Sequence, residues 1–105
     1  MKALNTLKFI SNATTRLTEV FTKIKHAETY KAARIEAVGA MGYIDCVVTF
    51  LNTLLCSENN TLTGELHELI YTWRDKVWDS LAMNAIATKQ DPSVLERIMD
   101  KKELY

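Results

Sequence analysis

The chain has 105 residues, of which 48% are hydrophobic and 25% are charged, with one proline and three glycines. This composition is typical of a soluble globular domain and excludes collagen-like sequence and wholesale disorder. Thirteen basic and thirteen acidic residues cancel, so no overall field attracts nucleic acid or anionic lipid. We expect one domain over residues 1–105, and the spacing of its hydrophobic residues predicts that this domain is helical.

Hydrophobic spacing predicts an all-α fold, either a small bundle or a helical hairpin, with three main helices and a short C-terminal helix. The first helix is expected over residues 4–28, with a narrow stripe at three- and four-residue spacing: Leu7, Ile10, Thr14, Leu17, Phe21 and Ile24. No residue between Lys23 and Arg34 stops a helix firmly. One long bent helix through this region therefore remains open.

The second helix, over residues 30–56, is the most apolar. Its apolar arc of roughly 220° predicts a core helix that protein buries on most sides. The stretch from Val38 to Cys56 has the length of a membrane span and a single charge, Asp45. That carboxylate would cost about 2.5–3.5 kcal/mol at a membrane centre, so we expect no membrane association.

Two features of the sequence favour a cytoplasmic protein. The N-terminus lacks the apolar run of a signal peptide. Two cysteines, Cys46 and Cys56, are too few for a disulfide scaffold. We expect both to be reduced, buried small hydrophobes.

The third helix is expected to begin with a cap at Thr61 or Thr63 and to run to about Thr88. Its core stripe consists of Leu66, Ile70, Trp73, Val77 and Leu81. A short last helix should follow, with Asp91 as its N-cap and Pro92 in its first position.

A second face of the third helix is the most informative feature of the sequence. His67, Tyr71, Arg74 and Trp78 stand at helical spacing beside the core stripe. Tyrosine, arginine and tryptophan dominate binding hot spots, so we predict that these four residues bind a partner protein. The alternative is that Tyr71 and Trp78 complete the core against the last helix.

Acidic residues gather on a third face, nearly opposite the core stripe: Glu65, Glu68, Asp75 and Asp79. We expect this face to be solvated, with docking of a basic partner as the alternative.

A basic stripe exists if the first helix continues through Arg34, because several cations then share an arc of roughly 140°. The candidate contacts for phosphate or an acidic partner are Lys8, Arg16, Lys23, Lys31 and Arg34. A break near residue 28 would rotate Lys31 and Arg34 away from the arc. A solvated face is the favoured account of this stripe.

Charge is divided along the chain although its total is zero. Residues 1–44 hold seven basic and three acidic residues, a net of +4, and residues 45–88 hold two basic and six acidic residues, a net of −4. Complementary charge of this kind can set register between subunits. We expect a homo-oligomer, with a symmetric dimer as its form.

Enzyme motifs are incomplete. His67 and Glu68 begin a zinc-protease motif, but Tyr71 occupies the position of the second histidine. The carboxylates Glu65, Glu68, Glu96 and Asp100 fall short of the magnesium-binding pattern of helical nucleotide pyrophosphohydrolases, because the second pair is one residue too widely spaced. We predict no catalytic residues, no metal and no cofactor.

The sequence therefore predicts a non-catalytic protein-binding module, a small adaptor or inhibitor that acts through a helical surface. A phage or mobile-element protein that blocks a host factor is one concrete form. The alternative is a helical protein that binds nucleic acid or a nucleotide through the basic stripe. Salt dependence separates the two, because phosphate contacts weaken steeply with salt.

Overall fold

The structure is a computed structural model of the chain, and it describes the backbone of residues 2–57 and 64–104 and the side chains of residues 7–53 and 64–103. All elements in these ranges are α-helices: α1 (Lys2–His26), α2 (Tyr30–Ser57), α3 (Gly64–Ala87) and α4 (Pro92–Leu104). The predicted all-α bundle is confirmed. The cap predicted at Thr61 or Thr63 lies outside the described residues.

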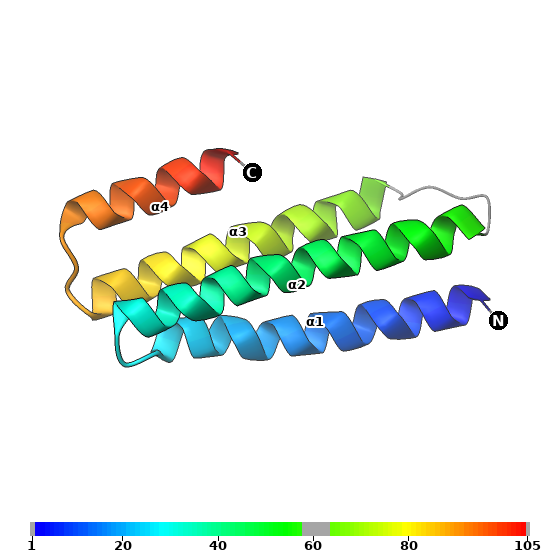
Figure 1. The fold of residues 1–105 in the computed structure, drawn as a ribbon, viewed down its shortest axis with the longest axis horizontal. Coiled ribbons are helices and arrows are strands. Elements are labelled where there is room, and N and C mark those ends of the chain that lie inside the picture. The colour runs from blue at the N-terminus through cyan, green and yellow to red at the C-terminus, as the bar shows by residue number, and fades with distance from the viewer. Residues whose placement is uncertain (1, 58–63, 105) are drawn as a thin grey trace.

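The first three helices form an elongated antiparallel bundle in which each contacts the other two (Figure 1). The molecule measures 49 × 24 × 17 Å. The short α4 contacts α3 alone among the described helices. Lys102, near the end of α4, pairs with Asp79 in the middle of α3, so α4 covers only the C-terminal half of α3.

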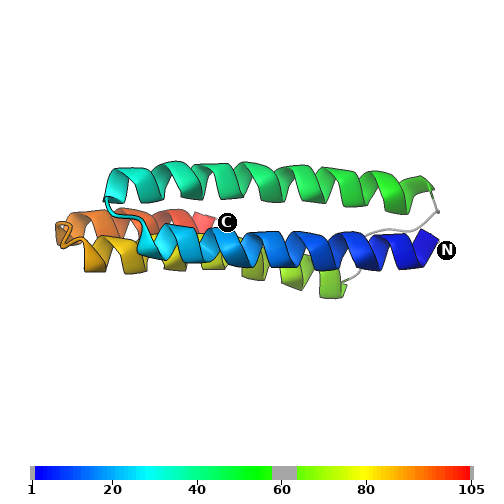
Figure 2. The ribbon, with the colours of Figure 1, turned by 90° about the horizontal axis from the view of Figure 1, so that it is seen from below.

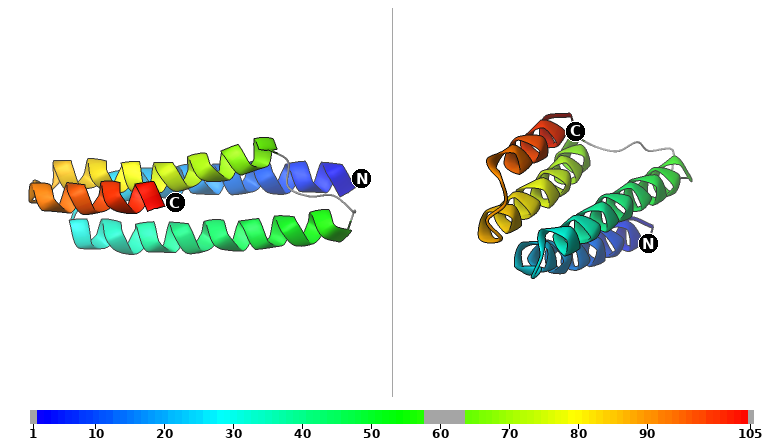
Figure 3. Two further views of the ribbon diagram at one scale, coloured as in Figure 1. Left: turned by 90° about the horizontal axis from the view of Figure 1, so that it is seen from above. Right: turned by 60° about the vertical axis from the view of Figure 1, so that its left-hand side comes forward.

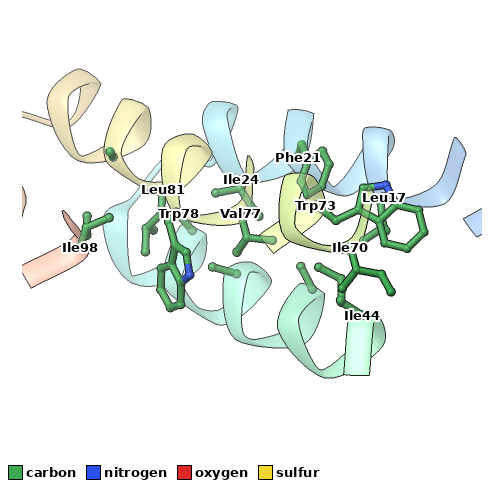
Figure 4. Close-up of a cluster of buried hydrophobic side chains, with 14 of the residues drawn as sticks. Leu17, Phe21, Ile24, Ile44, Ile70, Trp73, Val77, Trp78, Leu81 and Ile98 are labelled. Carbon is green, nitrogen blue, oxygen red and sulfur yellow. The ribbon is translucent and has the colours of Figure 1, made fainter. Parts of the chain in front are cut away.

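The core runs along the axis between the three long helices, and Figure 4 shows its central part. The predicted stripe of α3 is confirmed at Ile70, Trp73, Val77 and Leu81, which are buried. The stripe of α1 is confirmed at Leu17, Phe21 and Ile24 and is wrong at Leu7, which is 64% exposed. Leu7 lies near the end of the bundle, beyond the packed centre of the core.

A tight turn separates α1 from α2, so the continuous helix that the sequence left open does not form. The Thr29 hydroxyl accepts a hydrogen bond from the backbone N–H of Ala32 at 3.1 Å and caps α2. The buried Asn84 of α3 donates from Nδ2 to the carbonyl of Ala27 at 2.8 Å. One side chain of α3 therefore holds the turn between the other two long helices.

The connection from α3 to α4 is formed by local hydrogen bonds that end α3 and cap α4. Lys89 adopts a left-handed backbone with φ of 58°, and the N–H of Gln90 donates to the carbonyl of Ala85 at 2.9 Å. These features end α3 in a Schellman motif. The Asp91 carboxylate accepts from the N–H of Ser93 at 2.9 Å, which confirms the predicted cap with Pro92 in the first position.

The prediction that α2 is buried on most sides is wrong. Only one face is buried, and 28% of the residues in its most apolar window are enclosed. On the opposite side Ile35 is 66% and Val38 71% exposed, and Cys46 is exposed rather than buried as expected. The reason is topological, because α4 packs on α3 and no described helix covers the outer side of α2 (Figures 2 and 3). Cys56 lies outside the described side chains.

By length and composition alone, α2 is also the one helix among the described residues that could cross a membrane, over Tyr30–Thr53.

Candidate functional site

The four predicted partner-binding residues lie on one side of α3 but in different surroundings. Trp78 is buried, with 8% of its surface exposed, whereas Tyr71 is 53% exposed. His67 is also exposed, and Arg74 is half-buried. Lys101 of α4 lies 6.0 Å from the centre of the Trp78 ring, whereas Tyr71 is two helical turns nearer the N-terminus of α3. We refer to His67, Tyr71 and Arg74 as the Tyr71 face.

An ion pair joins the Tyr71 face to α2. The Arg74 guanidinium donates to Asp45 Oδ1 at 3.3 Å, with 23% of the arginine side chain and 67% of the aspartate side chain exposed. Asp45 is therefore both exposed and paired. Arg74 Nε is buried and forms no hydrogen bond with the described residues. The pair directs Arg74 toward α2, and Tyr71 lies one helical turn before it on the same side of α3.

Trp78 forms the floor of a groove between α2 and α4. The groove has a volume of about 160 Å³, and α2 contributes Tyr30, Arg34 and Val38 to its wall. From α4 come Val94, Arg97 and Lys101. The groove exists because α4 contacts α3 but not α2. We refer to it as the α2–α4 groove.

The charge of the α2–α4 groove is uniformly positive. Arg34, Arg97 and Lys101 line it, and no carboxylate among the described residues does so. The Lys101 ammonium lies 6.0 Å from the centre of the Trp78 ring, within the range of a cation–π contact. The apolar floor is thus bordered by cations from two helices.

The predicted acidic face is solvated for most of its length. Glu65, Glu68 and Asp75 are exposed. Asp79 Oδ1 accepts from Lys102 Nζ at 2.8 Å. This hydrogen bond raises the pKa of Lys102 above its usual value, and the ion pair ties α4 to α3.

The five predicted basic contacts do not share one arc, because the turn at residues 27–29 divides them between two antiparallel helices. Lys8, Arg16 and Lys23 are on α1, and Arg16 lies 5.5 Å from the centre of the Tyr43 ring on α2. Lys31 and Arg34 are on α2, where Arg34 faces the α2–α4 groove. The condition on which the stripe depended, a helix through Arg34, is not met.

Among the described residues, no group of three or more histidine, cysteine, aspartate or glutamate side chains is placed to hold a metal ion.

Sequence reasoning missed the α2–α4 groove. Its signal was available in the last helix, where Val94, Arg97, Ile98 and Lys101 recur at three- and four-residue spacing. This pattern places two cations beside the apolar side of α4. The contribution of α2 could not be predicted, because it depends on where α4 packs.

No protein-family model, curated protein or solved structure matches the chain.

Proposed function

We propose that the protein is a non-catalytic binding module, a small adaptor or inhibitor that acts on another protein through the side of the bundle formed by α2, α3 and α4. The observation that carries the proposal is the exposure of Tyr71. It is a large aromatic side chain, 53% exposed, one helical turn from Arg74, which pairs with Asp45 at 3.3 Å. Tyrosine and arginine are enriched at binding hot spots.

Further apolar exposure on the same side of the molecule supports the proposal. Val38 is 71% exposed and lines the α2–α4 groove. A single exposed apolar residue is ordinary, but Val38 lies beside the Trp78 ring in one groove, and apolar residues grouped in this way occur at interaction sites. In this proposal the three long helices supply a rigid body, and the 13-residue α4 completes the binding side.

In this proposal the protein is cytoplasmic and does not insert in a membrane. Asp45 lies near the middle of α2 and is held by Arg74 from α3. A span formed by α2 would bring this carboxylate into hydrocarbon, where ionised groups are costly.

Binding of nucleic acid by the N-terminal cations is the weaker alternative. Lys8, Arg16 and Lys23 remain on α1, separated by the turn from Lys31 and Arg34. A nucleic-acid complex would lose affinity steeply with salt, whereas a protein complex centred on Tyr71 would not.

Site-specific photo-crosslinking tests the proposal. The variant Tyr71→p-benzoylphenylalanine, expressed in the native host and irradiated, should give a discrete protein adduct that survives nuclease treatment and is identified by mass spectrometry. The matched control carries the same group at Thr15, an exposed residue of α1. Absence of an adduct at position 71, an adduct that nuclease removes, or the same adducts from both positions would refute the proposal.

A further inference from the structure

The α2–α4 groove carries a more specific inference about the partner. Its floor is apolar, formed by Trp78 and Leu81 of α3, and its two walls come from helices that do not contact each other. A groove with an apolar floor between two helices can receive a side chain from outside the molecule, although Trp78 and Leu81 are themselves largely buried.

Among the described residues, the cations that line the groove form no direct ion pair. On α4, Lys102 points to Asp79 and is paired at 2.8 Å. Arg97 and Lys101 of the same helix line the groove together with Arg34 of α2, and none of the three forms an ion pair with the described residues. Asp91 acts on Arg97 only at longer range, so the three cations remain able to pair with carboxylates of a ligand.

The size of the groove limits what can occupy it. Sites for small molecules and cofactors have volumes of about 300–1,000 Å³, and the volume of this groove is about 160 Å³. One or two side chains fill such a space. A side chain that anchors a longer segment fits this size better than a free metabolite.

We propose that the α2–α4 groove docks an acidic amphipathic helix of a partner protein. An apolar side chain of that helix rests on Trp78, and carboxylates one turn to either side pair with Arg34, Arg97 and Lys101. Residues three and four apart share one face of a helix, and this is the arrangement of helix-in-groove recognition. The inference rests on the proposed protein-binding function and adds the chemistry of the partner.

Peptide binding tests the inference. The probe is a fluorescein-labelled 15-residue peptide with leucine at alternating three- and four-residue spacing and glutamate on the flanking positions, titrated with the protein and followed by fluorescence anisotropy. The same peptide with lysine in place of glutamate and a labelled 15-nucleotide single-stranded DNA are the comparison ligands. The glutamate peptide should bind at least about ten-fold more tightly than the lysine peptide, because charge complementarity sets the choice of partner.

Charge reversal locates the binding. The double variant Arg34→Glu/Arg97→Glu should weaken binding of the glutamate peptide by at least about ten-fold. The control Lys76→Glu/Lys89→Glu has the same change in net charge at exposed positions outside the groove, and it should change affinity by less than about two-fold. Thermal melting checks that both variants fold; if the groove variant does not, Arg34→Gln and Arg97→Gln are compared singly with Lys76→Gln.

Three results would overturn the inference: no preference for the glutamate peptide, equal weakening by both double variants, or tighter binding of the DNA in competition with the peptide. These results leave the crosslinking experiment at Tyr71 unaffected. A specific protein adduct at Tyr71 together with failed peptide binding would reject the groove inference alone, whereas loss of the adduct would reject the proposed function.

Discussion

At the scale of single residues, the position of α4 decides what a side chain of α3 does. Tyr71 and Trp78 are two turns apart on one side of the helix, yet one is 53% and the other 8% exposed. Trp78 lies beneath Lys101 of α4 and within the core cluster. Tyr71 lies two turns nearer the N-terminus of α3, and its exposed ring is available to a partner.

The Asp45–Arg74 pair is expected to contribute little to stability. Asp45→Leu should fold and keep its free energy of unfolding within about 1 kcal/mol of the wild type, because exposed ion pairs are worth about that or less. Asp45 is 67% exposed in the pair. Urea denaturation measures the difference, and a loss of about 3 kcal/mol or more, the scale of a broken buried pair, would show that Asp45 supports the packing of α2 on α3.

Asn84 is expected to matter far more, because it is fully buried and donates to the carbonyls of Ala27 and Lys25. Asn84→Ala should lower the free energy of unfolding by about 2 kcal/mol or more, since it leaves the partly buried carbonyl groups of Lys25 and Ala27 without this donor and empties a buried site. The control is Asn12→Ala on the exposed side of α1, which should stay within about 0.5 kcal/mol. Equal effects of the two changes in urea denaturation would contradict this role.

At the scale of helices, the features that depend on neighbours in sequence were predictable and those that depend on packing were not. The start of α4 follows from Asp91 and Pro92, and the buried stripe of α3 follows from its spacing. The exposure of Val38 and Cys46 did not follow, because an apolar helix looks the same in sequence whether two helices or three surround it.

The candidate site also has features that were predictable from the sequence and features that were not. Spacing placed His67, Tyr71, Arg74 and Trp78 on one side of a helix. Which of them stays exposed depends on the 13-residue length of α4 and on the half of α3 that it covers. The α2–α4 groove depends on a helix packing that no local pattern encodes.

The N-cap residue Asp91 should make the stability of α4 depend on pH. The backbone N–H of Ser93 donates to Asp91 and lowers the pKa of that carboxyl below its ordinary value of 3.8. A folded-state pKa below the unfolded value means that the cap stabilises α4 above the unfolded pKa and is lost as pH falls through the folded pKa.

The variant Asp91→Asn keeps a capping oxygen that does not titrate. The difference in unfolding free energy between wild type and this variant should therefore shrink as pH falls from about 6 to 2. Urea denaturation monitored by circular dichroism at each pH measures it. A difference that does not change across this range would show that the cap makes no pH-dependent contribution.

At the scale of the whole molecule, the uncovered side of α2 predicts self-association. Ile35, which lies outside the α2–α4 groove, is 66% exposed, and no described helix lies over it. A second copy that covers this side would bury that apolar surface and form a symmetric dimer. Sedimentation velocity at micromolar concentration should report a dimer.

Ile35→Lys should shift the dimer toward monomer, because it places a charge in the buried contact. Met83→Lys, at a residue of α3 that is 55% exposed, serves as the control and should leave the dimer intact. A wild-type protein that stays monomeric throughout the micromolar range would contradict self-association.

The claim that the Tyr71 face recognises a partner protein is tested most directly by isothermal titration calorimetry of Tyr71→Ala with the partner identified by crosslinking. Tyr71 is half-exposed, so the variant should keep its free energy of unfolding within about 0.5 kcal/mol and weaken binding by about 2 kcal/mol or more. Trp78→Ala, by contrast, should cost about 3–5 kcal/mol of folding stability, as expected for a core tryptophan. Wild-type affinity in a folded Tyr71→Ala variant would contradict the account.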